Sequence, residues 1–271
     1  MSEPEDLQDG RAVSVPAGER PTSLLSPGDP KPASVQNAGG RSPFLLVCDH
    51  AGRSIPRALG RLGVPEPELH RHIAWDIGAG AVAAELGRRL DACVVLQAYS
   101  RLVIDCNRPL DVPSLIPEVS DGVQIPANVG LSPRARQQRI DEIHEPYHGA
   151  IDRAADARLT AGRPTLLVAV HSFTPVMDGF RRPWRFGVLH AGDSPLSARM
   201  LTALRTEAEV SEVGDNEPYA LGPLDCTVPR HAQARGLDYL ELEIRQDLIA
   251  APEDQARMAA FLDRLLRSCG S

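Results

Sequence analysis

Residues 44–56 read FLLVCDHAGRSIP, an apolar run that ends abruptly in polar residues. The run from Phe44 to Cys48 has the pattern of a strand that is buried on both faces of a parallel sheet. Asp49 and His50 follow it directly. In open α/β sheets, ligands bind just beyond the carboxyl ends of the strands. The sequence therefore places His50 at a candidate binding edge.

Further apolar runs alternate with segments of helical periodicity along the chain. Strands are predicted at 92–98, 102–106, 165–170, 186–189 and 239–244, and helices at 77–90, 133–159, 195–208 and 252–266. Pro146 is expected to kink the second of these helices. The alternation predicts a three-layer α/β fold, with helices on both faces of a mixed, mostly parallel central sheet.

The first 42 residues differ in composition from the rest of the chain. They are rich in Pro, Gly, Ser and charged residues and show no apolar periodicity, which predicts a disordered tail over residues 1–42. Residues 43–271 have a length that suits one α/β domain, and we expect this single domain to carry the function.

Composition excludes several classes of function. The net charge is −7 without a basic block, which argues against a nucleic-acid partner. No apolar run has membrane length and the N-terminus is acidic, which predicts a cytoplasmic protein without a membrane partner. The sole lysine, Lys31, lies in the predicted tail, so Schiff-base catalysis and a P-loop lysine are excluded. The composition leaves the oligomeric state open.

The cysteines point to a reducing compartment. They are odd in number, widely spaced and without a CxxC pair, which argues against a disulfide framework or a structural zinc knot. The five are Cys48, Cys93, Cys106, Cys226 and Cys269.

A second strongly apolar run, TLLVAV, also ends in a histidine, His171. Neutral imidazole is a common zinc ligand, and catalytic zinc typically takes three protein ligands and leaves one position for water. A single histidine at a strand end is more simply interpreted as a hydrogen-bonded loop residue. Two of them, on two strands predicted to be parallel, favour a zinc site formed by His50 and His171.

The third ligand of such a site is expected to be a carboxylate. Asp76, at the start of the predicted helix 77–90, is the best candidate, and Glu66 and Glu68 are alternatives. Asp76 also fits the N-cap of that helix. A second histidine pair, His144 and His148, has the i,i+4 spacing of metal ligands, but without an HExxH pattern we interpret it as solvated or hydrogen-bonded.

The strand predicted at 239–244 carries two acidic residues, Glu241 and Glu243, on one face. One interpretation is the solvated face of an edge strand. The other interpretation is that Glu243 is buried for a function, because burying an unpaired carboxylate costs free energy. Glu243 would then be the general base that deprotonates a zinc-activated water.

Arginines near the strand ends are candidates for holding an anionic substrate. Arg101, Asn107 and Arg108 flank the run LVIDC and would donate charge-assisted hydrogen bonds to a substrate carboxylate, and Arg245 follows the late strand. The proline-rich segment 109–132 is long for a loop inside a domain, and such loops are usually functional lids or disordered.

The set of motifs CDHAG, HIAWDIGA, YSRLVIDCNRP, VAVHSFTP, GDNEPY and LEIRQDLI, in this order over residues 43–268, resembles the N-formylglutamate amidohydrolase family. It is most similar to the branch labelled as predicted N-formylglutamate amidohydrolases. The family is similar in fold to zinc carboxypeptidases, aspartoacylases and cell-wall amidases, which implies a zinc-exopeptidase-like (phosphorylase/hydrolase-like) arrangement.

The resemblance implies zinc ligands at His50 and His171, substrate-carboxylate contacts from Asn107 and Arg108, and a glutamate base at Glu243. The chain departs from the carboxypeptidase-like relatives at one point. They carry HxxE at the first ligand, whereas the residue three positions after His50 is Arg53. The remaining ligand must come from elsewhere, and Asp76 stays a hypothesis.

The sequence thus predicts a Zn²⁺-dependent amidohydrolase of an N-acylated acidic amino acid, with N-formyl-L-glutamate, cleaved to formate and L-glutamate, as the default substrate. Arg101 or Arg108 would hold a substrate carboxylate. Two alternatives remain open. One is a metal-free cysteine amidase that uses Cys48 and His50. The other is a non-catalytic carboxylate-binding protein of the same fold.

Overall fold

The computed structural model describes residues 23–177, 179–207 and 210–270. In this part of the chain, seven strands form one sheet in the order β1-β3-β2-β6-β11-β9-β10. Their bounds are β1 Ala33–Gln36, β2 Phe44–Cys48, β3 Cys93–Gln97, β6 Leu166–Phe173, β9 Phe186–Leu189, β10 Val213–Asp215 and β11 Asp238–Arg245.

The four central strands run in one direction, and the strands at both borders run in the opposite direction. β3, β2, β6 and β11 pair in parallel, whereas β1 pairs antiparallel with β3 and β9 pairs antiparallel with β11. The sheet is therefore mixed, as predicted. Since β2, β6 and β11 are neighbours that run in one direction, their carboxyl ends lie at the same edge.

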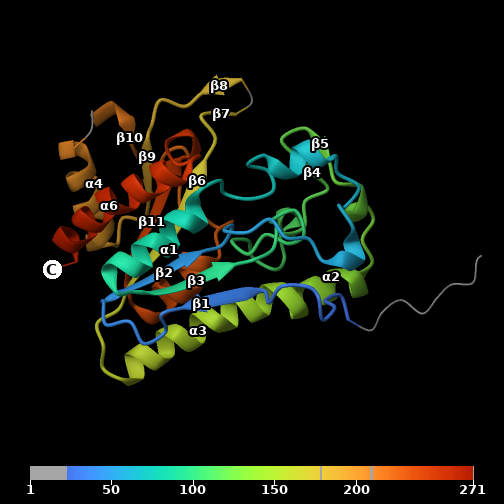
Figure 1. Cartoon of the computed structure of the whole chain (residues 1–271), viewed down its shortest axis with the longest axis horizontal. Coiled ribbons are helices and arrows are strands. Elements are labelled where there is room, and N and C mark those ends of the chain that lie inside the picture. The colour runs from blue at the N-terminus through green and yellow to red at the C-terminus, as the bar shows by residue number, and fades with distance from the viewer. Residues whose placement is uncertain (1–22, 178, 208–209, 271) are drawn as a thin grey trace, which may run out of the picture.

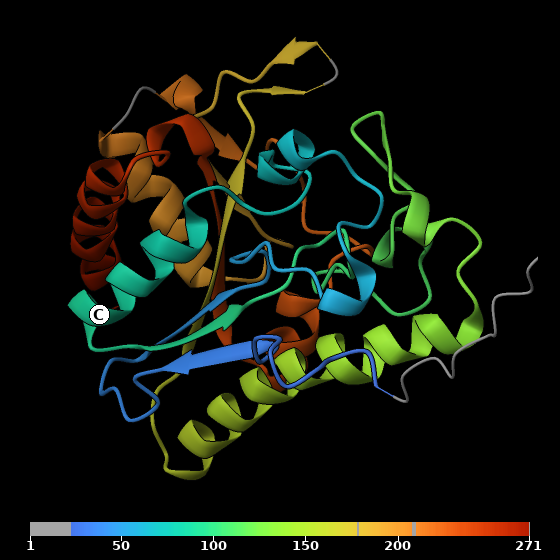
Figure 2. The same cartoon turned by 45° about the vertical axis from the view of Figure 1, so that its right-hand side comes forward.

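Helices cover both faces of the sheet (Figure 1). On one face, α1 (Ala79–Leu90), α4 (Pro195–Glu207) and α6 (Pro252–Cys269) enclose an apolar cluster with side chains such as Leu46 and Val170. On the other, α3 (Glu145–Thr160) and α5 (Thr227–His231) cover Leu45 and Leu167. Figure 2 shows the same separation of the helices from a second direction. The predicted three-layer architecture is confirmed.

The helix predicted from residue 133 is divided by a π-helical turn. α2 (Pro133–Arg139) leads into the turn Ile140–His144, and α3 follows. Pro146 has no N–H to donate back into the helix, and the N–H of Glu145 instead reaches the carbonyl of Ile140. The interruption expected at Pro146 thus takes the form of a widened turn.

Shorter elements complete the described chain. Two hairpins, β4–β5 (Val119–Ser120, Val123–Gln124) and β7–β8 (Val176–Met177, Phe180–Arg181), lie outside the main sheet, and Figure 2 shows the second projecting beyond it. The 3₁₀ turns are Arg57–Leu59, Glu66–His70, Pro113–Leu115, Pro126–Asn128, Val210–Glu212, Gln233–Arg235 and Gln246–Leu248. No helix of the described residues is long and apolar enough to span a bilayer.

The prediction of a disordered tail over residues 1–42 is wrong for its second half. Residues 33–36 form β1, and the main-chain N–H of Leu24 donates to Glu142 at 2.7 Å. β1 has mostly exposed side chains, so it shows no apolar periodicity, and it forms because β3 offers open backbone groups at its edge. The ordered chain therefore begins before residue 43. Residues 1–22 lie outside the described residues.

The strand predicted at 102–106 is also absent. This segment forms turns, and Leu102, Val103 and Ile104 are buried in a third apolar cluster built from loops. The run is apolar because it anchors those loops, which lie above the carboxyl ends of the strands and form a wall of the site described next.

Candidate active site

A cavity of about 460 Å³ lies at the carboxyl ends of β2, β6 and β11. Many charged and polar side chains from segments far apart in the sequence line it. They include His50, Asp76, Arg101, Asp105, Asn107, Arg108, His171, Asp225, Glu241 and Glu243. Three carboxyl ends of parallel strands thus deliver groups to one place, as the strand-end rule predicts.

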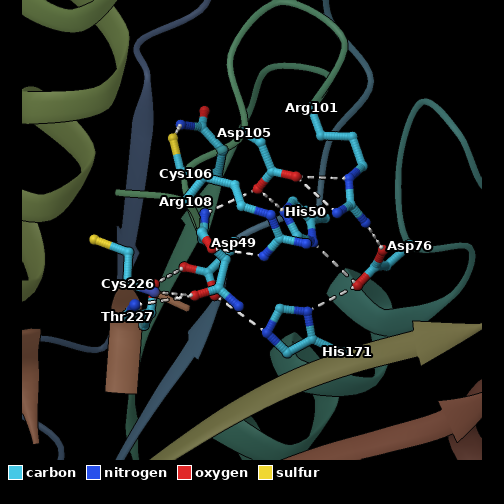
Figure 3. A network of polar contacts seen from close by, with 12 residues as sticks. Asp49, His50, Asp76, Arg101, Asp105, Cys106, Arg108, His171, Cys226 and Thr227 are labelled. Atoms are coloured by element: carbon cyan, nitrogen blue, oxygen red, sulfur yellow. Dashed lines mark hydrogen bonds and ion pairs between the residues drawn. The ribbon is translucent and has the colours of Figure 1, made fainter. Parts of the chain in front are cut away.

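Three buried side chains converge at the base of the cavity (Figure 3). Asp76 Oδ2 lies 2.9 Å from His171 Nδ1 and 3.4 Å from His50 Nδ1. One potential ligand atom from each residue lies within 4.8 Å of the other two. These are the three residues that the sequence predicted as metal ligands.

The backbone around Asp76 explains its position. The N–H of Asp76 donates to the carbonyl of His50 at 2.9 Å, and its carboxylate accepts from the N–H of Ser172 at 3.2 Å. Asp76 does not cap helix α1, because the helix begins at Ala79 after Gly78, whose φ is 81°. Its side chain is directed at the two histidines instead.

Each of the two histidines has a carboxylate at its far ring nitrogen. His50 Nε2 lies 2.7 Å from Asp105 Oδ1, and His171 Nε2 lies 3.1 Å from Asp49 Oδ2, an ion-pair contact without hydrogen-bond alignment. Asp49 is in turn fixed by the Tyr147 hydroxyl at 2.8 Å. Proteins orient metal-binding histidines in this way. The sequence did not indicate this role for Asp49 and Asp105, although Asp49 directly follows the first apolar run.

The electrostatics of this group suit a cation. Burial and Arg101 oppose protonation of His50, yet Asp105 and Asp76 raise its pKa. Burial opposes ionisation of Asp76, yet His50 and His171 hold its pKa below the usual value. His50 Nδ1 is buried without a hydrogen-bond partner among the described residues. Two imidazole nitrogens and one carboxylate are a donor set for Zn²⁺, so these residues fit the predicted metal.

Glu241 and Glu243 lie on β11, between β6 and β9 and inside the sheet. The interpretation of a solvated edge strand is therefore wrong. Glu243 is in register with His171, and Glu241 Oε1 lies 4.0 Å from His171 Nε2. Burial raises the pKa of Glu241 to about 8 and that of Glu243 to about 7. Within the described residues, Oε2 of each glutamate has no hydrogen-bond partner. Both carboxyl groups are thus suited to exchange a proton near neutral pH.

Arg101 is held by carboxylates on two sides. Its Nε and Nη2 donate to Asp105 Oδ2 at 3.0 and 2.7 Å, and Nη1 lies 3.5 Å from Asp76 Oδ1. The two carboxylates outweigh burial and raise the pKa of Arg101. Arg101 therefore links the acid that orients His50 to the acid at the centre of the histidine pair, as Figure 3 shows.

Arg108 is less engaged than Arg101. In the part of the chain described, its side-chain contacts all use Nη1, which donates to the carbonyls of Asn107 and Leu224 and lies 3.7 Å from Asp225 Oδ1. Asn107 Oδ1 accepts from the N–H groups of Cys226 and Thr227, both at 3.0 Å. Asn107 thus ties the cavity wall to the start of α5, and Arg108 keeps donors for a bound anion.

The structure places Arg245 outside the lining of this cavity. Its Nε donates to Asp247 Oδ1 at 2.8 Å and its Nη1 to the Trp184 carbonyl at 3.2 Å. The alternative metal ligands are also elsewhere, since Glu66 pairs with His70 and Glu68 with Arg71. None of these contacts supports the site roles predicted for Arg245, Glu66 and Glu68.

Cys48 does not line the cavity either. It is fully buried in the apolar cluster that the sheet forms with α1, α4 and α6, and burial raises the pKa of its thiol. A nucleophile needs thiolate character and access to the substrate, and Cys48 has neither. The pairing with His50 on which the cysteine-amidase alternative depends has no support in this geometry.

Comparisons with known proteins agree with this picture. The sequence profile described as N-formylglutamate amidohydrolase matches residues 42–250. An N-formylglutamate deformylase from Pseudomonas putida is 30% identical over 196 residues, which cover 62% of this chain and 68% of that protein.

Two solved structures share the fold. A gene product of Agrobacterium tumefaciens superimposes with a TM-score of 0.87 at 38% identity, over 91% of this chain and 97% of that one. An N-formylglutamate amidohydrolase from Ralstonia eutropha has a TM-score of 0.67 at 19% identity, over 88% and 97% of the two chains, and supports the fold alone.

Proposed function

Because the chain belongs to the N-formylglutamate amidohydrolase family and is thus a hydrolase of amides, we propose that it cleaves N-formyl-L-glutamate to formate and L-glutamate with the help of Zn²⁺. One observation carries the proposal. His50 Nδ1, Asp76 Oδ2 and His171 Nδ1 converge at the base of a cavity in which Glu243 presents a carboxyl oxygen that has no hydrogen-bond partner among the described residues.

In this proposal His50, Asp76 and His171 hold the metal, while Asp105 and Asp49 fix the ring orientation of the two histidines. A bound Zn²⁺ would supply Lewis-acid polarisation of the scissile carbonyl and lower the pKa of water. Arg101 lies against Asp76 and Asp105, and its charge lowers the pKa of Asp105 and keeps that acid ionised.

Glu243 would act as the general base. It takes a proton from the attacking water and returns it to the amine nitrogen that leaves as L-glutamate. A carboxyl group whose pKa is raised to about 7 is suited to both transfers at neutral pH. Glu241, two residues away on the same face, is buried as well, and Glu243 helps to raise the pKa of Glu241.

Arg108 would bind a carboxylate of the substrate through its guanidinium fork. Among the described residues, the guanidinium of Arg108 makes contacts through Nη1 alone, which supports this assignment over Arg101, which two acids already hold. Asn107 would position Arg108 by fixing the adjoining backbone to α5.

The test is a substrate panel with purified, Zn²⁺-loaded protein. N-formyl, N-acetyl and N-succinyl derivatives of glutamate, aspartate and glutamine are incubated, and the free amine and the released acid are quantified. We expect formate and glutamate from N-formyl-L-glutamate, loss of activity with a chelator, and recovery with Zn²⁺. Absence of amine release from every acidic substrate would instead favour a carboxylate-binding protein, and activity that survives metal removal would reject the zinc step.

A further inference from the structure

A second group of metal-ligating side chains lies beside the cavity wall and plays no part in the proposed reaction. It comprises His144 at the end of the π turn, His148 in α3, and Cys226 directly before α5. Both histidines have no exposed surface, so they are not solvated. One ligand atom from each of the three residues lies within 4.8 Å of the other two, and Cys226 Sγ is 4.0 Å from His148 Nε2.

The hydrogen bonds of His148 run in a chain with an acceptor at each end. His148 Nε2 lies 2.8 Å from the carbonyl of Cys106, and His148 Nδ1 lies 2.7 Å from His231 Nε2. His231 Nδ1 lies 3.0 Å from Asp152 Oδ1. A neutral imidazole carries one N–H, so two neutral rings bring two protons to three contacts. This series of three hydrogen bonds is therefore one N–H donor short.

His144 has the same shortage. Its Nε2 lies 3.3 Å from the carbonyl of Arg108, and its Nδ1 lies 3.2 Å from Glu145 Oε1. Both neighbours accept hydrogen bonds, and a neutral ring has one proton to offer. One extra proton on the His148–His231 pair and one on His144 would satisfy all these contacts. Burial, however, disfavours a charged imidazolium.

We propose that His144 Nε2, His148 Nε2 and the Cys226 thiolate bind a second divalent, borderline-soft cation, for which Zn²⁺ is the match. With a cation at the Nε2 atoms, the protons move to Nδ1. His144 then donates to Glu145, His148 to His231, and His231 to Asp152, and every ring is neutral and satisfied. The thiol proton of Cys226 is released to solvent as the metal binds.

The arrangement repeats the design of the first site, where carboxylates hold the far nitrogens of His50 and His171. Zn–N bonds of about 2.0 Å and Zn–S bonds of about 2.3 Å require the three ligand atoms to draw together by small side-chain rotations. The carbonyl oxygen of Cys106 lies 2.8 Å from His148 Nε2, so it gives up this hydrogen bond when the cation binds.

The second cation has a structural role for the cavity. Cys226 and Thr227 hold Asn107 through their N–H groups, and the carbonyls of Cys106 and Arg108 face the two histidines. A metal there joins α3, the start of α5 and the segment 106–108. The second cation would therefore hold the backbone of residues 106–108 in place and so fix the position of Arg108.

Co²⁺ tests the site, because sulfur ligation gives a thiolate-to-metal charge-transfer absorption in the near ultraviolet, and the first site offers nitrogen and oxygen ligands alone. Metal-free protein is titrated with Co²⁺ and, separately, Zn²⁺ is counted after dialysis. We expect about two equivalents of metal and the thiolate absorption. Cys226→Ser should remove the absorption and one equivalent, while Cys269→Ser, at a buried cysteine remote from the cluster, should change neither.

Two further variants separate this site from the first one and from a loss of folding. His50→Ala should lose one equivalent and keep the thiolate absorption. Asp152→Asn should weaken Co²⁺ binding at the sulfur site by up to about 10-fold, the lower end of the cost for an outer group, because His231 stands between Asp152 and the ligand His148. Its matched control is Asp156→Asn, which also loses a contact with Arg235. Among the described residues, Asp156 has no contact with His144, His148 or His231. Uptake of one equivalent without thiolate absorption in the wild type, or absorption that persists in Cys226→Ser, would overturn the proposal.

Discussion

Glu241 and Glu243 stand two residues apart on β11 and both line the cavity, so they form a natural matched pair. We expect Glu243→Gln to lower kcat about 10²- to 10⁴-fold, the range for removal of a general base, with little change in bound metal. Glu241→Gln should cost much less. Steady-state kinetics of both variants on N-formyl-L-glutamate provide the measurement. The reverse ranking would move the base to Glu241.

The pH dependence of the reaction follows from the same carboxyl group. Burial raises the pKa of Glu243 to about 7, and only its ionised form accepts a proton. Activity should therefore fall as the pH drops below neutrality, with kcat/KM losing about tenfold per pH unit on the acidic limb. A cation bound nearby lowers this pKa, so the limb should lie at or below 7. Glu241→Gln should retain the acidic limb, and a flat profile down to pH 5 would contradict the assignment.

Arg108 distinguishes binding of substrate from support of the fold. If it grips a substrate carboxylate, Arg108→Lys should impair kcat/KM nearly as much as Arg108→Ala, because an ammonium cannot form the bidentate fork. The expected loss is on the order of 2–5 kcal/mol. A neutral amide analogue should lose far less. An equal loss on both substrates would assign Arg108 to its contact with Asp225 instead.

Sequence reasoning found the residues at strand ends and missed their partners. His50 and His171 follow from apolar runs that stop at a histidine or at an aspartate next to one, and Glu243 follows from the cost of burying a carboxylate within an apolar strand. The contact of His50 with Asp105 joins positions 55 residues apart, and no periodicity in the chain predicts it. Arg245 shows the converse error. It follows Glu243 by two residues, but it lies where the strand leaves the sheet and turns to Asp247.

At the scale of elements, the segment before residue 43 offers a direct test. Removal of residues 1–37 takes away β1, the buried Leu24 and its hydrogen bond to Glu142. We expect a loss of roughly 2–5 kcal/mol in the free energy of unfolding, from one large apolar side chain and several hydrogen bonds. Removal of residues 1–22 should cost little, as their composition predicts. Denaturant titrations of the two truncations decide it. Equal stability of both truncations would mean that the packing of residues 23–37 against the domain does not stabilise the fold.

The elements that sequence reasoning placed correctly are those whose own side chains enter the core. β2 is buried at all five positions and β9 at all four, so their apolar runs predict both strands. β1 is set by the open edge of β3, which lies 60 residues further along the chain. The run 102–106 is apolar for another reason, since it anchors loops. Apolarity reports burial, and tertiary contacts decide whether a buried segment is a strand.

For the molecule as a whole, the buried acids are expected to couple the binding of the proposed metal to stability. Asp49, Asp76, Asp105, Glu241 and Glu243 are all buried around two histidines. A cation that binds only the folded protein stabilises it, by about 2.7 kcal/mol at a free concentration 100-fold above Kd. We expect Zn²⁺ to raise Tm and a chelator to lower it.

This effect should require the ligands of the first site. His171→Asn should abolish most of the Zn²⁺-dependent rise in Tm that the first site contributes. His190→Asn is the control, because His190 also follows a strand end and pairs with an aspartate, Asp215, but does not line the cavity. Calorimetry with and without Zn²⁺ measures both. A full Zn²⁺ response in His171→Asn would remove this residue from the metal site.

The border strand β1 also prevents self-association of the protein through the edge of β3. An uncovered β3 would present a row of unpaired backbone groups on the apolar stretch CVVLQ, a template for aggregation. β1 covers it with four residues that are mostly exposed and that follow Pro30, Lys31 and Pro32. A short strand after a charged, proline-flanked entry is a poor template for another chain. Damage to β1 should therefore appear first as insoluble protein, before any change in the chemistry of the cavity.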